Sequence, residues 1–212
     1  MSHIVSVWSP SGGVGKTTLA ILLAECLEMR GFKTSVFDFS EDKNAKFLSE
    51  KNKLKTKVVS SPKELDNDIE ITIVDHQAYS EEDAGLESVN PDLLIVPVRP
   101  VLTHVVNLST FINNKMIDTE ILPVFNLCAF GRKENLKILN GYPKFFQIKN
   151  RGVYERMLNL QCSVFHSDAD VWASVNQARK EMEEFADLVI YKLKNIFPED
   201  AERKQKVLKL VK

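Results

Sequence analysis

The residue types that are rare in this chain exclude several classes of protein. Its 212 residues include three cysteines, Cys26, Cys128 and Cys162, and they show neither a C-x-x-C pair nor a Cys/His ligand spacing. Disulfides and a structural zinc site are therefore not expected, and this cysteine usage is typical of a reducing, cytoplasmic compartment. No apolar run approaches the length of a membrane-spanning helix, and we expect no signal peptide, because a glycine-rich motif begins near residue 9.

An excess of charge of one sign is also lacking. The 28 basic residues nearly balance the 29 acidic ones, so contacts with nucleic acid or membrane would depend on local patches. Hydrophobic residues make up 44% of the chain, which is ordinary for a globular protein of this length. Repeats, low-complexity tracts and linkers are not evident. We therefore expect a single domain over residues 1–212, with a basic tail or helix at 198–212.

Glycine is scarce as well, but it is concentrated at one place. Of eight glycines, Gly12, Gly13 and Gly15 lie within four residues, in the segment S-P-S-G-G-V-G-K-T-T at positions 9–18. An apolar run, Ile4 to Trp8, precedes the segment, and leucines and alanines at helical spacing follow it as far as Gly31. A strand, a glycine-rich turn and a helix in this order form a cradle of backbone N–H groups for phosphate.

The segment departs from the strict pattern G-x-x-x-x-G-K-[ST] only at Pro10, where the first glycine would stand. Lys16 is predicted to reach the β- and γ-phosphates, and the Thr17 hydroxyl is predicted to hold Mg²⁺. The residues predicted to contact the nucleotide here are Ser11, Gly12, Gly13, Val14, Gly15, Lys16, Thr17 and Thr18.

Strands and helices alternate along the rest of the chain. The expected strands are 4–8, 34–38, 69–75, 93–97, 121–127 and 145–148, and the expected helices are 17–30, 101–116, 132–140, 151–160 and 169–197. In the last helix, a stripe that includes Val171 and Val175 is expected to pack in the core. This alternation predicts an α/β fold with a doubly wound, mostly parallel sheet and helices on both faces.

Two aspartates come at the ends of expected strands, at the edge where the glycine-rich loop lies. Asp38 and Asp75 are therefore predicted to hold Mg²⁺ together with Thr17. Lys16 and Asp38 are predicted to be catalytic. His76 could act as a base near neutral pH, but a structural histidine beside the site is the preferred interpretation. His3, His104 and His166 are isolated in the sequence and receive no role.

The motif G-G-V-G-K-T-T resembles the ParA/MinD family of P-loop ATPases. Residues 36–45 resemble that family's switch segment, residues 71–75 resemble its Walker B strand, and residues 93–98 and 121–127 resemble later strands. The resemblance implies a P-loop NTPase fold, ATP and Mg²⁺ as cofactors, and an adenine contact at Asn126. It also implies a homodimer on ATP binding, non-specific DNA binding in plasmid or chromosome partition, and a companion adaptor or centromere-binding protein.

Two departures from the family pattern bear on hydrolysis. Ser11 stands where the family has a signature lysine that reaches the partner's nucleotide, and Ser40 stands at the second carboxylate of the switch segment. Serine supplies neither charge, and phosphoryl transfer depends on electrostatic stabilisation. The expectation is therefore a weak ATPase that binds ATP and turns it over slowly. Glu41, Asp42 or Lys43 could supply a replacement charge.

Three stretches are locally basic: 43–57, 144–156 and 203–212. Clustered lysine and arginine favour contact with DNA phosphates, and the last stretch could instead form a membrane-surface helix. Three alternatives stay open. The chain could be a MinD-like ATPase that positions machinery at a membrane or a cell pole, or a small-molecule ligase of the same superfamily. It could also be a nucleotide-binding scaffold that does not hydrolyse ATP.

Overall fold

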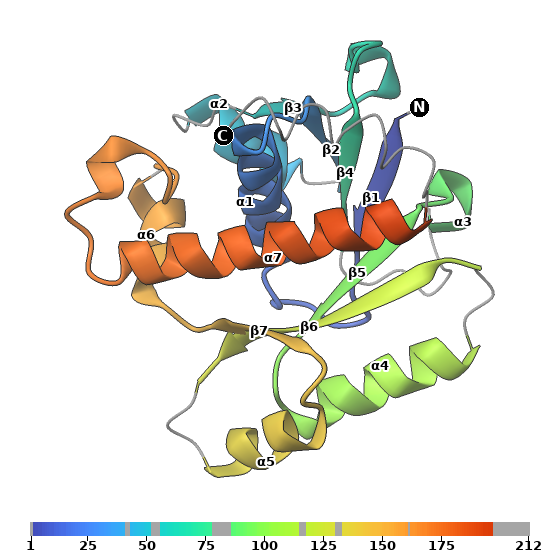
Figure 1. The fold of residues 1–212 in the computed structure, drawn as a ribbon, viewed down its shortest axis with the longest axis vertical. Coiled ribbons are helices and arrows are strands. Elements are labelled where there is room, and N and C mark those ends of the chain that lie inside the picture. Colours follow the sequence, from blue (N-terminus) through green and yellow to red (C-terminus); the bar gives the residue numbers. More distant parts are fainter. Residues whose placement is uncertain are drawn as a thin grey trace.

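The strands assemble into one seven-stranded sheet, in the order β3-β2-β4-β1-β5-β6-β7, in which every pair is parallel (Figure 1). The computed structural model describes residues 2–40, 43–51, 56–77, 86–114, 118–129, 133–160 and 162–196. Its strands are β1 (His3–Val7), β2 (Thr34–Phe39), β3 (Lys57–Val59), β4 (Ile71–His76), β5 (Leu93–Val98), β6 (Glu120–Cys128) and β7 (Phe146–Lys149).

A helix follows each strand from β1 to β6 except β3, which is followed by a 3₁₀ turn. The helices are α1 (Lys16–Met29), α2 (Asn44–Lys51), α3 (Leu86–Val89), α4 (Leu102–Asn114), α5 (Lys133–Gly141), α6 (Gly152–Leu160) and α7 (Val175–Ile196), with 3₁₀ turns at Pro62–Glu64 and Ser167–Ala169. None of the helices in the described ranges is long and apolar enough to cross a membrane.

The sheet separates two hydrophobic cores. The larger core lies between the sheet and helices α1, α6 and α7, and Phe185 of α7 is fully buried in it. The smaller core lies on the other face beneath α4 and α5, and Trp8 packs there against Phe111 with ring centroids 4.4 Å apart. Strand β5 is buried on both faces, since Ile95 faces the larger core and Leu94 the smaller one. This explains the continuous apolar run 93–98.

The topology brings three strand ends to one edge. Strand β1 lies between β4 and β5, so the chain passes from one side of β1 to the other between those two strands. In parallel register, Asp75 of β4 pairs with Val7 of β1 on one side and with Asp38 of β2 on the other. The carboxyl ends of β1, β2 and β4 therefore meet at the switch point where such sheets bind ligands.

The predicted α/β sheet is confirmed, with three differences in detail. Strand β3 and the short helices α2 and α3 were not predicted. The last helix begins at Val175 rather than at residue 169, because residues 167–174 form a 3₁₀ turn and a bend that ends at Ser174 with φ +67°. The expectation that Val171 belongs to the core stripe was wrong, since it is 88% exposed. The basic segment 198–212 lies outside the described residues.

Candidate nucleotide-binding site

The glycine-rich loop follows β1 and ends in the first turn of α1. Gly13 and Gly15 have φ values of +63° and +83°, in the left-handed region that favours glycine. Gly15 is the N-cap residue of α1 and provides no side chain to cap the helix. The first N–H groups of α1 therefore lack a side-chain acceptor at the cap, and with the positive end of the helix dipole they form a binding surface for phosphate.

Asn126 of β6 holds this loop in place. Its Nδ2 donates a hydrogen bond to the Val14 carbonyl at 2.7 Å, and its Oδ1 accepts one from the Leu127 N–H at 2.9 Å. A Cβ at Gly15 would lie 2.7 Å from the same Nδ2, so the amide also requires glycine at that position. Asn126 therefore positions the loop, and its predicted contact with adenine stays a prediction.

Asp75 is a buried carboxylate at the end of β4. It is fully inaccessible to solvent, and neither oxygen makes a well-formed hydrogen bond to a described residue. Burial raises the pKa of Asp75 to about 7, although the nearby Thr17 hydroxyl opposes the rise. A buried carboxylate beside a hydroxyl offers the hard oxygen ligands that Mg²⁺ takes, so Asp75 and Thr17 fit the ion predicted here.

Lys16 completes this corner of the site. Its side chain is 8% exposed, and burial lowers the pKa of its ammonium while the Asp75 carboxylate raises it. The structure brings Lys16, Thr17 and Asp75 together at this corner, and their predicted roles toward nucleotide and Mg²⁺ stay predictions. A buried lysine at the start of α1 places one more positive charge beside the phosphate-binding N–H groups.

Asp38, at the end of β2, has the opposite environment. Its Oδ1 accepts hydrogen bonds from the N–H of Ser40 at 3.1 Å and from the Ser40 hydroxyl at 2.5 Å, and its Oδ2 accepts one from the Lys46 N–H at 3.0 Å. The Lys43 ammonium donates to the Asp38 carbonyl at 3.1 Å. Asp38 therefore holds the start of α2 against β2, and its predicted metal and catalytic roles stay predictions.

Ser11 and Ser40, which the resemblance sets against charged residues of the family pattern, are both buried. Ser40 is engaged by Asp38 as described, and its side chain is 7% exposed. The Ser11 N–H donates to the Ser9 hydroxyl at 3.2 Å, whereas the Ser11 hydroxyl has no hydrogen-bond partner among the described residues. A buried hydroxyl without a protein partner is costly, and this one is available to a ligand bound in the loop.

His76 is buried on the strand after Asp75. Its Nε2 lies 3.0 Å from the Ser6 hydroxyl, and the ring packs edge-on against Phe39. Burial lowers the pKa of His76 to about 4, so the ring is neutral near pH 7. It is therefore placed as a structural histidine, in line with the interpretation that the sequence favoured.

A pocket of about 330 Å³ opens beside the glycine-rich loop. Its lining includes three polar residues, Asn126, Asn150 and Arg151, and a mostly apolar group formed by Leu19, Leu22, Ile148, Tyr154 and Met182. Sequence reasoning missed Arg151 and Tyr154, which no motif marks. Arg151 is fixed by two hydrogen bonds to Glu181 of α7, at 2.6 Å and 3.1 Å. A mostly apolar pocket with a few polar groups next to a phosphate cradle has the chemistry of a nucleoside site.

Comparison with known proteins places this site in a family. Residues 5–210 match the family model of the CobQ/CobB/MinD/ParA nucleotide binding domain. The chain has no match among curated proteins.

Solved structures share the fold at low sequence identity. The McdA(D38A)–ATP complex from Cyanothece is similar with a TM-score of 0.65, 16% identity, and coverage of 93% of this chain and 96% of that one. The septum site-determining protein MinD with Mg-ADP, from Pyrococcus horikoshii, has a TM-score of 0.63, 17% identity, and coverage of 91% and 99%. A plasmid partition protein from Borrelia burgdorferi has a TM-score of 0.57, 15% identity, and coverage of 75% and 97%. The chain belongs to the ParA/MinD family of P-loop nucleotide-binding proteins.

Proposed function

We propose that the chain is an ATP-binding, ParA-like protein that dimerises when it binds nucleotide and acts in DNA partition. The observation that carries the proposal is the corner formed by Lys16, Thr17 and the buried Asp75 carboxylate, beside a mostly apolar pocket of about 330 Å³. The glycine-rich loop and the N-terminus of α1 would hold the phosphates, while Asp75 and Thr17 would hold Mg²⁺. The ion, when bound, offsets phosphate charge, and Lys16 adds a second positive charge.

Nucleotide binding is tested first with Lys16→Ala. We expect it to abolish measurable binding of ATP and ADP in isothermal titration calorimetry, because the buried ammonium is lost from the phosphate cradle. Lys57→Ala is the matched control, since that ammonium pairs with Asp66 at an exposed site on β3. Unchanged binding by the Lys16 variant would contradict the site.

We infer that hydrolysis is slow, because Ser40 supplies a hydroxyl, and not a carboxylate, beside Asp38. Ser40→Asp is expected to raise the rate of phosphate release from ATP, since it restores a charge that can orient water. Ser40→Ala also removes the hydrogen bond from the Ser40 hydroxyl to Asp38 but adds no charge, and it should leave the rate low. If both variants have equal rates, or if the wild type turns over as fast as a well-evolved enzyme, the inference is wrong.

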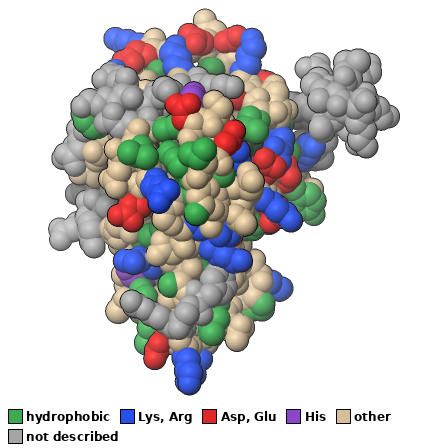
Figure 2. All heavy atoms as spheres, turned by 90° about the vertical axis from the view of Figure 1, so that its left-hand side faces the viewer, with side chains coloured by type: hydrophobic (Ala, Val, Ile, Leu, Met, Phe, Trp, Pro, Cys, Tyr) green, Lys and Arg blue, Asp and Glu red, His purple; other side chains and the backbone are tan. Residues whose placement is uncertain are grey.

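The DNA-binding surface is proposed to be the basic segment 203–212. In the other two basic segments, several cations are already matched within the protein: Lys46 with Glu64, Lys57 with Asp66, and Arg151 with Glu181. On the face shown in Figure 2, positive and negative side chains lie intermixed among the described residues. These pairs reduce the net positive charge that segments 43–57 and 144–156 offer to phosphates.

The experiment that tests this role measures binding to non-specific duplex DNA at low salt with ATP, with ADP and without nucleotide, beside anionic liposomes. We expect binding that requires ATP, weakens with salt, and is lost when the charges of 203–212 are reversed. Sedimentation of the same samples tests the proposed ATP-dependent dimer. Binding to liposomes alone would favour a MinD-like positioning protein. Binding to neither would favour a scaffold or a small-molecule enzyme.

A further inference from the structure

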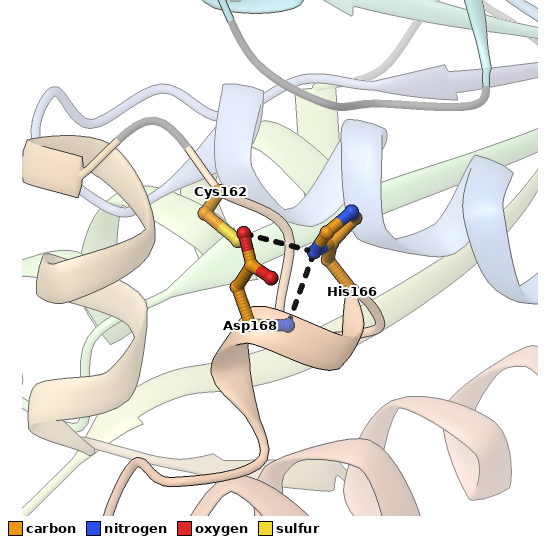
Figure 3. A group of neighbouring side chains, drawn as sticks. All are labelled: Cys162, His166 and Asp168. Carbon is orange, nitrogen blue, oxygen red and sulfur yellow. Dashed lines mark hydrogen bonds and ion pairs between the residues drawn. The ribbon is translucent and has the colours of Figure 1, made fainter.

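The segment between α6 and α7 brings together three side chains that no part of the nucleotide site uses. Cys162, His166 and Asp168 each offer one metal-ligating atom, and these atoms all lie within 4.8 Å of one another (Figure 3). The three residues fall within seven positions of the sequence, as C-x₃-H-x-D. That spacing differs from paired zinc motifs, so no metal site was expected from it.

The ligand atoms of Cys162, His166 and Asp168 face a common space. In Figure 3 the Cys162 sulfur, an Asp168 oxygen and one ring nitrogen of His166 face one another, while the other ring nitrogen points away. The Nδ1 of His166 lies 3.5 Å from the Asp168 Oδ2. A nucleophilic triad would need the cysteine and the carboxylate on opposite nitrogens of the ring. Here both face one side, which is the arrangement of ligands around an ion.

The tautomer of His166 suits a ligand. Its Nδ1 accepts a hydrogen bond from the Asp168 N–H at 3.1 Å, so that nitrogen carries a lone pair and the proton of the neutral ring is on Nε2. The Nδ1 nitrogen of His166, which caps the 3₁₀ turn, is therefore also the nitrogen that faces the Cys162 sulfur and the Asp168 carboxylate. An ion would compete with a single amide for it.

Neighbouring elements hold the segment on two sides. The Ser163 hydroxyl donates to the buried Glu25 carboxylate of α1 and also accepts from the Phe165 N–H at 3.1 Å. Arg179 of α7 donates to the Val164 and His166 carbonyls at 2.7 Å and 3.1 Å, and its charge is met by Asp170 at 2.7 Å. These contacts fix the backbone on both sides of the cluster, as supporting interactions do in metal sites.

We propose that Cys162, His166 and Asp168 form a binding site for a zinc-type divalent cation. One thiolate, one imidazole and one carboxylate are the ligand types that Zn²⁺ accepts, and water would take the fourth position of a tetrahedron. Solvent can reach that position, because the side chains of His166 and Asp168 are 27% and 54% exposed while Cys162 is buried. Binding releases the thiol proton to solvent, so the affinity rises with pH.

The test uses the full chain, freed of metal with a chelator and titrated with Co²⁺ and then with Zn²⁺. We expect one Co²⁺ per chain with a thiolate-to-metal charge-transfer band, and we expect Zn²⁺ to displace it. Cys162→Ser should remove the band and weaken Zn²⁺ binding by at least about tenfold in competition with a chromogenic chelator. Cys128→Ser, at a second buried cysteine on β6, is the matched control and should leave both readouts unchanged.

His166→Asn separates a ligand from a structural cap. Asparagine can still accept from the Asp168 N–H but supplies no imidazole, so we expect the fold to persist and Zn²⁺ binding to weaken by a similar factor. Circular dichroism in chelator checks the fold of each variant. The proposal is overturned if the wild type shows no charge-transfer band, or if Cys162→Ser or His166→Asn binds Zn²⁺ as tightly as the wild type.

Discussion

Two adjacent residues, Asp75 and His76, are expected to give opposite slopes to the pH dependence of stability. Both side chains are buried at the end of β4, at 0% and 2% exposure. Burial raises the pKa of Asp75 from 3.8 to about 7 and lowers the pKa of His76 from 6.5 to about 4. In both cases the cause is the cost of placing a charge away from water.

The sign follows from which state binds more protons. Between pH 3.8 and 7 the folded protein keeps a proton on Asp75 that the unfolded chain releases, so this residue lowers the free energy of unfolding as pH rises. Between pH 4 and 6.5 the unfolded chain holds a proton on His76 that the folded protein does not, so stability rises with pH. Each pH unit is worth about 1.4 kcal/mol, which gives a loss of about 4 kcal/mol from Asp75 and a gain of about 3 kcal/mol from His76.

The two slopes nearly cancel in the wild type and separate in variants. From pH 4 to pH 6.5 the free energy of unfolding of Asp75→Asn should rise by about 3 kcal/mol, whereas that of the wild type should stay nearly constant. His76→Gln should lose about 3 kcal/mol relative to the wild type between pH 4 and 6.5, and the double variant should again follow the wild-type profile. All other titrating groups are shared and drop out of the comparison.

The measurement is urea unfolding followed by tryptophan fluorescence at half-unit steps from pH 4 to 7.5. It is made without nucleotide and with a chelator of divalent ions. Trp8 lies beneath α4 and Trp172 in the larger core, so both cores report on the transition. Parallel profiles for the wild type and Asp75→Asn would refute the reasoning, because they would show that the buried carboxylate has an ordinary pKa.

Further substitutions test the loop and the core. Gly15→Ala should destabilise the protein by about 2 kcal/mol or more, since it adds strain at φ +83° and a Cβ 2.7 Å from the Asn126 Nδ2. Gly31→Ala at φ +86°, with open space around it, should cost only about 1–2 kcal/mol, and equal losses in thermal unfolding would exclude the steric contact. Phe185→Ala should cost about 3–5 kcal/mol, because Phe185 is fully buried against Phe146, whereas Tyr191→Ala on the exposed side of α7 should change stability by about 0.5 kcal/mol or less.

The parts of the site that could be predicted from sequence are those whose chemistry is local. The strand, glycines and Lys16 of the loop follow one another along the chain, so spacing alone fixes their geometry. Asp75 could be predicted because a carboxylate at the end of a buried parallel strand must reach the same edge of the sheet. The sheet itself was predictable for the same reason, since the apolar run 93–98 is buried on both faces.

Features that depend on distant packing could not be predicted. The role of Asn126 rests on a hydrogen bond to Val14, 112 residues away. The apolar lining of the pocket comes from α1, β7, α6 and α7, and nothing in the local sequence around Tyr154 shows that these elements meet. The start of α7 was misplaced because the spacing of Val171 and Val175 fits a helix, whereas the contacts of residues 167–174 favour a 3₁₀ turn and a bend.

In the sequence Asp38 and Asp75 look alike, as two carboxylates at the ends of neighbouring strands. In the structure their hydrogen-bonding surroundings differ, so we expect different roles for them. Hydrogen bonds from Ser40 and Lys46 already compensate the buried carboxylate of Asp38, so in the structure this residue ties the start of α2 to β2. Nothing comparable compensates Asp75, whose oxygens lack well-formed hydrogen bonds to described residues and whose pKa lies near 7. A cation gains most where a buried carboxylate has no other partner. We therefore expect Asp75 to be the main metal ligand from the protein, and Asp38 to respond to nucleotide through the segment that it holds.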